Sequence, residues 1–191
     1  IILALIFTGF IFFGQPFMYF WGGEGYSESY YITLWLILPV TVPLIQNLGI
    51  EIQRAKNKHK TRSIVYFCIA IANVIISIPL IRIFGTTGAA MGTSISLICG
   101  NILFMNWYYH THIGLDMVYF WKSIVQFVPS LVAPCIVGVL IMMLIPIHSL
   151  LSLGLWTILY TTVYCISVYS LGMNNEEKQM VMGPVRKILK R

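Results

Sequence analysis

The chain has 191 residues, of which 58% are hydrophobic and only 9% are charged, and its formal net charge is +6. About 25% of the residues of an ordinary soluble domain are charged, so this composition excludes a water-soluble protein and predicts an integral membrane protein. At roughly 20 apolar residues per crossing of the bilayer, the length allows about six helices.

Six apolar runs follow one another along the chain, and each is long enough to cross a bilayer. Because they are uniformly apolar and do not alternate, they predict helices and not the strands of a barrel. Together they form a six-span region over residues 1–172, followed by a basic cytoplasmic tail over 173–191. The runs cover residues 1–22, 29–49, 64–84, 86–108, 123–146 and 150–172.

The first run begins at Ile1, without the basic segment or the cleavage site of a signal peptide. We therefore expect the chain to be the C-terminal portion of a longer protein. The second run carries Pro39 and Pro43 one helical turn apart. Proline inside a helix removes a hydrogen bond and bends the axis, so both residues are hinge candidates.

A few uncharged polar residues interrupt the apolar runs, and lipid cannot satisfy their hydrogen bonds. They are candidates to line a hydrophilic cavity that binds sugar hydroxyls; the plainer alternative is hydrogen bonding between helices. Arg82 joins them as a candidate that meets phosphate, or else it extends to the membrane interface. The candidates are Gln15, Gln46, Asn47, Asn73, Arg82 and Asn101, and Asn106 is a further uncharged polar residue of the fourth run.

The segment between the second and third runs, "EIQRAKNKHKTR", concentrates positive charge in a chain that is otherwise apolar. Positive charge marks the cytoplasmic side of membrane loops. With residues 51–63 inside, eleven of the 12 Lys and Arg residues are cytoplasmic and only Arg82 is outside. A second interpretation is that the cluster attracts the anionic headgroup or pyrophosphate of a substrate at the inner leaflet. Its cationic residues are Arg54, Lys56, Lys58, Lys60 and Arg62.

The fourth run begins with small residues that recur every four positions, at Gly88, Gly92, Ser96 and Gly100. On a helix they form one nearly bare stripe, which lets the backbone of a second helix approach closely. The stripe therefore predicts a tightly packed helix, with or without a role in transport.

Residues suited to catalysis are scarce. The chain has one aspartate, Asp116, which excludes a DxD metal site of a nucleotide-sugar transferase within it. His110, His112 and Asp116 could in principle hold zinc, but a wet interfacial loop is the simpler interpretation. The chain has no Walker A motif and no basic–aromatic surface for nucleic acid. We therefore predict no catalytic residue, metal or cofactor.

Two stretches, "FWGGEGYSESY" and the region from "NLGIEIQRAKNKHKTR" to "GTTGAAMGTSISL", resemble the C-terminal half of a known transporter family. This family is that of the Wzx-type polysaccharide flippases, members of the multidrug/oligosaccharidyl-lipid/polysaccharide exporter superfamily. The "GTTGAAMGTSIS" segment after an Asn-containing helix is the most distinctive part. The resemblance covers roughly residues 15–125.

The resemblance implies a fold of about 12 to 14 transmembrane helices in two lobes around a central cavity, of which this all-α chain is the final six. It implies a flippase that moves polyprenyl-diphosphate-linked oligosaccharide across the bacterial inner membrane for surface polysaccharide biosynthesis. The expected partners are that substrate, the lipid bilayer, the missing N-terminal lobe and other polysaccharide-assembly proteins. Alternatives are a drug/cation antiporter of the same superfamily and a membrane-embedded glycan-assembly enzyme such as a polymerase.

Overall fold

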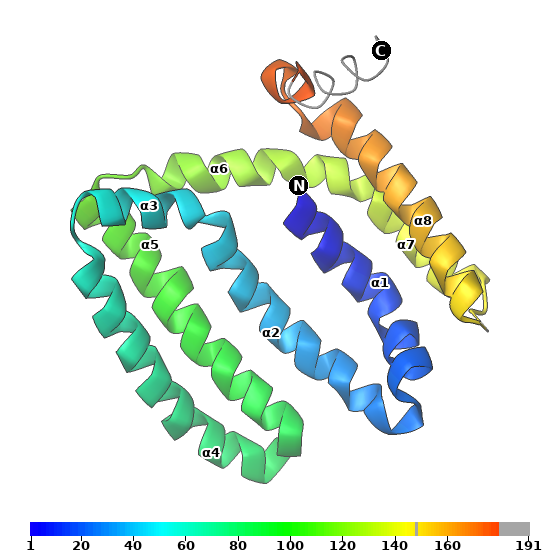
Figure 1. Ribbon diagram of the computed structural model, residues 1–191, viewed down its shortest axis with the longest axis horizontal. Coiled ribbons are helices and arrows are strands. Elements are labelled where there is room, and N and C mark those ends of the chain that lie inside the picture. The colour runs from blue at the N-terminus through cyan, green and yellow to red at the C-terminus, as the bar shows by residue number, and fades with distance from the viewer. Residues whose placement is uncertain (148, 180–191) are drawn as a thin grey trace, which may run out of the picture. The chain divides into compact units, whose positions relative to one another are not determined.

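A computed structural model describes residues 1–147 and 149–179 of the chain, and within these residues every regular element is a helix. The chain divides into two compact units. Unit 1 comprises Ile1–Phe13 and Phe120–Arg191, and unit 2 comprises Gly14–Tyr119. Helix α1 (Ile2–Gly22) contributes its first part to unit 1 and the remainder to unit 2 (Figure 1).

Unit 2 continues from α1 with a single turn, η1 (Glu24–Tyr26), and then α2 (Ser27–Ile45) and α3 (Asn47–Ala55). The long helix α4 (His59–Leu97) follows, and the helical path continues through the π-helical stretch η2 (Ile98–Phe104), α5 (Met105–Tyr108) and η3 (Tyr109–Ile113). Figure 1 shows α2 running beside the segment from α4 to α5.

The segment from His59 to Ile113 is a hairpin, because the chain reverses within α4 at Gly85 (Figure 1). Gly85 has φ 59° and ψ −138°, a backbone conformation that favours glycine. We call residues 59–84 the first arm and residues 86–113 the second arm. The two arms run antiparallel and lie against each other in unit 2.

The small-residue stripe of the second arm faces the first arm. A Cβ added to Gly88 would lie 2.1 Å from the backbone oxygen of Leu80, and one added to Gly100 would lie 2.2 Å from the Ile69 side chain. Gly92 meets Ser77 in the same way, at 2.2 Å from its Oγ. These residues therefore set how closely the two arms approach.

Unit 1 is built from the beginning of α1 and from the chain after Tyr119. This part of the chain contains most of α6 (Met117–Phe127), followed by η4 (Val128–Leu131), α7 (Val132–Leu144), α8 (Leu150–Ser167) and η5 (Val168–Gly172). Its core is aromatic: the rings of Phe12 and Phe13 lie 5.8 and 5.4 Å from the ring of Tyr160, measured between centroids. Gly138 of α7 lets the Phe12 ring approach, because an added Cβ would lie 2.5 Å from that ring.

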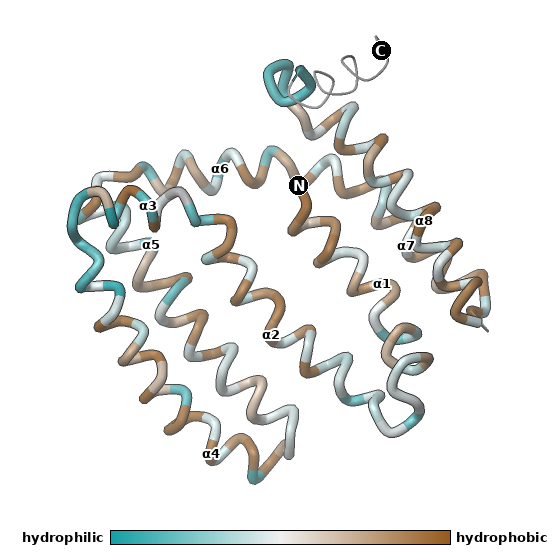
Figure 2. The backbone as a smooth tube through the Cα atoms, viewed as in Figure 1, coloured by the Kyte–Doolittle hydropathy of each residue, from teal (hydrophilic) through white to brown (hydrophobic). Residues whose placement is uncertain are grey.

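Five helical segments among the described residues are long and apolar enough to cross a membrane. They are Ile2–Gly22, Glu24–Ile45, His59–Ile113, Met117–Leu144 and Leu150–Gly172. Hydrophobic residues run along all of them (Figure 2), and many large apolar side chains are exposed on their surfaces. The prediction of a helical membrane protein is therefore confirmed. The third segment contains both arms of the hairpin, which accounts for the difference from the six expected runs.

Several helices extend beyond the apolar runs that predicted them. The expected loop 51–63 is largely helical, since α3 ends at Ala55 and α4 begins at His59. The expected loop 109–122 contains η3 and the start of α6. Lys, Arg and Gln favour helices, so a polar segment marks contact with water and not the end of a helix. In the tail, Arg186, Lys187, Lys190 and Arg191 lie outside the described residues.

Candidate functional site

The cationic residues gather at one end of unit 2, where the α3–α4 connection meets the end of the second arm. We call this region, residues 51–63 with 109–116, the basic end. Lys56 Nζ donates a hydrogen bond to the carbonyl oxygen of Ile113 at 2.6 Å, and Lys58 Nζ donates to that of His112 at 2.7 Å. Carbonyl oxygens at a helix C-terminus lack helical partners and attract cations. These two lysines therefore fasten the connection to the second arm.

Arg62 links the same two segments through tyrosines. Its Nη1 donates to Tyr109 Oη at 3.0 Å, its Nη2 donates to Tyr66 Oη at 2.9 Å, and its guanidinium lies 5.1 Å from the centre of the Tyr66 ring. Arg54 forms an exposed ion pair with Glu51 at 2.8 Å, a type of contact that contributes little to stability. Most cations of the basic end are thus engaged within the protein.

Lys60 differs from the other cations of the basic end. Its side chain is exposed, and no hydrogen bond or ion pair joins it to any residue that the structure describes. The neighbouring Thr61 instead contacts the second arm, where its Oγ1 lies 3.1 Å from Tyr108 Oη. The ammonium group of Lys60 is therefore available to an anion at the membrane surface.

Two of the uncharged polar candidates, Gln46 and Asn73, lie in separate clusters of unit 2. Beside the basic end, Gln46 Nε2 donates to Asn106 Oδ1 at 2.7 Å, and Asn106 Nδ2 donates to the Ile102 carbonyl oxygen at 2.6 Å. Gln46 is only 4% exposed, so this contact joins α2 to the second arm inside the protein. The sequence analysis named both Gln46 and Asn106 as polar residues of the apolar runs, but no local pattern showed that they pair.

The second cluster lies between the arms of the hairpin. Asn73 Oδ1 accepts hydrogen bonds from Ser77 Oγ at 2.7 Å and from Thr93 Oγ1 at 3.2 Å. Among the remaining candidates, Asn101 is buried, whereas Gln15, Asn47 and Arg82 are exposed. The structure therefore places Gln46 and Asn73 in contacts between helices and does not bring all six candidates together.

Two serines that the sequence analysis did not single out donate hydrogen bonds to carbonyl oxygens that prolines leave without a helical donor. Proline lacks an N–H, so Pro39 leaves the carbonyl oxygen of Trp35, four residues earlier, without its helical donor. Ser94 Oγ of the second arm donates to this Trp35 oxygen. The hinge candidate Pro39 is itself buried within the continuous helix α2, next to this contact from another helix. Pro43 is partly exposed.

Unit 1 contains the same arrangement. Pro134 of α7 leaves the carbonyl oxygen of Ser130 without its helical donor. Ser167 Oγ, which is buried at the end of α8, donates to this Ser130 oxygen at 2.6 Å. No pattern within α8 could have identified this role, because the partner lies 37 residues away in the sequence.

Of the three residues weighed for metal binding, His110 is exposed, and His112 and Asp116 have other partners. His112 stacks on the Tyr108 ring at 5.0 Å between centroids, and its Nδ1 lies 2.7 Å from Thr111 Oγ1. Asp116 Oδ1 accepts hydrogen bonds from the backbone N–H groups of Val118 and Tyr119, at 3.1 and 3.0 Å, and so caps α6. Within the described residues, no three His, Cys, Asp or Glu side chains are grouped so as to hold a metal ion.

Comparison with known proteins identifies no relative of this chain. No family model, no curated protein and no solved structure matches this chain.

Proposed function

We propose that the chain is part of a flippase that carries polyprenyl-diphosphate-linked oligosaccharide from the inner to the outer leaflet of a bacterial inner membrane. In this proposal the hairpin contributes two crossings, so the chain crosses the bilayer six times with the basic end and the C-terminus in the cytoplasm. The sugar–diphosphate head passes through a hydrated cavity shared with a second lobe, while the lipid tail stays in the bilayer. Alternating access moves the head between the leaflets.

The observation that supports transport best is the way in which α2 is held. The Trp35 carbonyl oxygen, which Pro39 leaves without its helical donor, accepts from the Ser94 hydroxyl, and the end of α2 is joined to the second arm by the Gln46–Asn106 pair. Both contacts are neutral hydrogen bonds between helices, which contribute modestly in membranes and can be exchanged for other partners. A helix that contains Pro39 and Pro43 and is held by such contacts is suited to alternate between two positions.

The choice of substrate class rests on two further points. The resemblance of residues 15–125 to Wzx-type flippases indicates that the substrate is a lipid-linked oligosaccharide. The basic end supplies a physical reason, since cations at the inner leaflet attract the diphosphate before transport.

Deletion of the full-length gene tests the proposal. Because lipid-linked repeat units could no longer leave the inner leaflet, we expect them to accumulate there, and the wild-type gene should restore their movement. The Gln46→Leu variant should restore it several-fold less well, because the leucine cannot pair with Asn106. A matched control is Thr162→Val, which changes an exposed hydroxyl that bonds only to its own helix at Ile158.

Each contrary outcome has a distinct meaning. Normal outward movement of the repeat units in the deletion strain would overturn the proposal. Single repeat units that reach the outer face but remain unpolymerised would identify a polymerase instead. Increased drug sensitivity with normal surface polysaccharide would identify an antiporter.

A further inference from the structure

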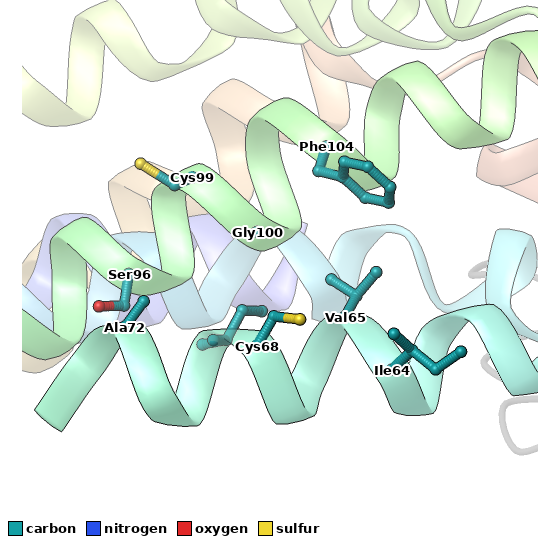
Figure 3. A pocket seen from close by; sticks show the side chains of 9 residues that line it. Ile64, Val65, Cys68, Ala72, Ser96, Cys99, Gly100 and Phe104 are labelled. Atoms are coloured by element: carbon teal, nitrogen blue, oxygen red, sulfur yellow. The ribbon is translucent and has the colours of Figure 1, made fainter. Parts of the chain in front are cut away.

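An apolar groove of about 310 Å³ runs between the two arms of the hairpin. The first arm lines it with Ile64, Cys68 and Ala72, and the second arm lines it with Cys99, Gly100 and Phe104 (Figure 3). These three residues of the second arm lie in the π-helical stretch η2, a local widening of the helix that is frequent at functional sites. The groove has almost no polar lining, so it suits a hydrocarbon chain and excludes a sugar.

The groove is open along one side and faces the surroundings of unit 2. Ile64, Cys68, Cys99 and Phe104 are all exposed, whereas Val65 and Ile69 are buried between the arms and form its floor. In a membrane protein, a side that is both exposed and apolar meets lipid. A lipid chain can therefore enter the groove sideways from the bilayer.

The cationic residue Lys60 lies at one end of this open side. Lys60, Ile64 and Cys68 are spaced by four residues on the first arm, and residues at this spacing are neighbours on a helix surface. Lys60 thus continues the row of lining residues by one turn toward the basic end. Because Lys56, Lys58 and Arg62 donate to groups within the protein, Lys60 is the cation placed to meet an anionic group there.

The length of the groove fits one leaflet. At 1.5 Å per residue, the wall from Ile64 to Ala72 is about 12 Å long. Half of the hydrocarbon core of a bilayer is about 15 Å thick. A phospholipid acyl chain that starts at the interface and ends near the midplane therefore spans the groove, whereas a polyprenyl chain is much longer than the groove.

We propose that the groove binds one acyl chain of an anionic glycerophospholipid, whose phosphate group pairs with Lys60. The lipid is a resident of the leaflet that contains the basic end. It fills the open side of the hairpin and is distinct from the transported substrate. The proposal does not depend on flippase activity, because it rests on the groove, on its length and on the cation at its end.

Photocrosslinking tests this proposal in the full-length protein. The protein is placed in vesicles of phosphatidylcholine and phosphatidylglycerol in equal parts, and one of the two lipids carries a photoreactive diazirine in its acyl chain. Mass spectrometry of peptides then locates the crosslinks. We expect phosphatidylglycerol to label residues 64–72 and 96–104 several-fold more than phosphatidylcholine does.

Two variants separate a specific contact from general attraction to the membrane surface. Lys60→Gln should remove the preference for phosphatidylglycerol at the groove. Lys58→Gln removes the same charge two residues away and should keep the preference, because Lys58 donates to the His112 carbonyl oxygen. Both lysines are exposed, and in both variants Lys56 still fastens the connection to the Ile113 carbonyl oxygen.

Three outcomes would overturn the proposal. One is equal labelling of the groove by both lipids, and a second is a preference that survives Lys60→Gln or is lost equally with Lys58→Gln. The third is loss of the labelling when a small amount of polyprenyl diphosphate is added, which would assign the groove to the transported substrate. The deletion experiment decides the proposed function separately.

Discussion

Ser94 and Ser167 each donate a hydrogen bond to a carbonyl oxygen that a proline of another helix leaves without its donor. In lipid such an oxygen has no water to bind, so an unsatisfied one costs free energy. Each serine therefore stabilises a proline-containing helix from outside it. This explains how the chain keeps Pro39 and Pro134 buried within its packed helices.

Ser94→Ala should destabilise the protein by about 1 kcal/mol, the usual scale of such bonds between membrane helices. In a Pro39→Ala background the same change should cost less, because the alanine supplies an N–H to the Trp35 oxygen. A double-mutant cycle measured by unfolding in mixed detergent checks this coupling. Ser96→Ala is the control: Ser96 bonds to Gly92 of its own helix, so its cost should be small and equal in both backgrounds. Equal costs of Ser94→Ala in the two backgrounds would contradict the explanation.

The glycines of the second arm offer a second test at this scale. Gly88→Ala should destabilise the hairpin by about 1–3 kcal/mol, the range of overpacked interiors, because its Cβ would lie 2.1 Å from the rigid backbone of Leu80. Gly154→Ala in α8 is the matched control, since nothing lies within 4 Å of its added Cβ. It should be neutral or slightly stabilising, because alanine favours helices. Thermal unfolding in detergent compares them, and an equal effect of the two changes would refute close packing at Gly88.

At the scale of elements, the hairpin of α4 shows what the sequence predicted and what it left open. The apolar runs 64–84 and 86–108 leave a single residue, Gly85, between them, and counted as two crossings they place a reversal near this residue. They do not say how one residue makes the reversal or which faces of the two arms meet. These features depend on the backbone of Gly85 and on the fit of Gly88, Gly92 and Gly100 against the first arm.

Gly85→Ala should weaken the reversal, because a residue with a Cβ is strained at φ 59° and ψ −138° by about 1–3 kcal/mol. A pair of spin labels, one on each arm near the turn, reports their separation. We expect the distance distribution to broaden in the variant. Gly25→Ala, at a glycine with no positive φ and no neighbour within 4 Å, should leave the distribution unchanged. An unchanged distribution for Gly85→Ala would show that packing alone holds the turn.

At the scale of the whole molecule, the two ends of unit 2 have opposite characters. Lys56 and Lys58 join the α3–α4 connection to the end of the second arm, while Thr86 Oγ1 beside the hairpin turn donates to Glu28 Oε2 at 3.2 Å. The helices α2 and α4 connect these ends. If the basic end lies in the cytoplasm, as the distribution of cations predicts, then Glu28 lies outside.

Cysteines introduced by Lys58→Cys and Glu28→Cys test this orientation in sealed cells. A thiol reagent that cannot cross the membrane should modify position 28 and spare position 58, and both should react once the cells are opened. Both side chains are exposed, so failure to react reports protection by the membrane and not burial. Modification of position 58 and not of position 28 in sealed cells would show the opposite orientation. Modification of both positions would contradict a unit 2 that spans the membrane.

The sequence by itself determined that this is a helical membrane protein, which residues are its cations and where its glycines and prolines interrupt apolar helices. These properties follow from composition and local spacing. Only the tertiary structure decided which faces of the third and fourth runs meet across the reversal at Gly85, that Ser94 donates to the carbonyl oxygen of Trp35, and that Lys60 remains available beside an apolar groove. Each of these depends on contacts between residues far apart in the sequence, and no local pattern of apolar helices records which of their faces meet.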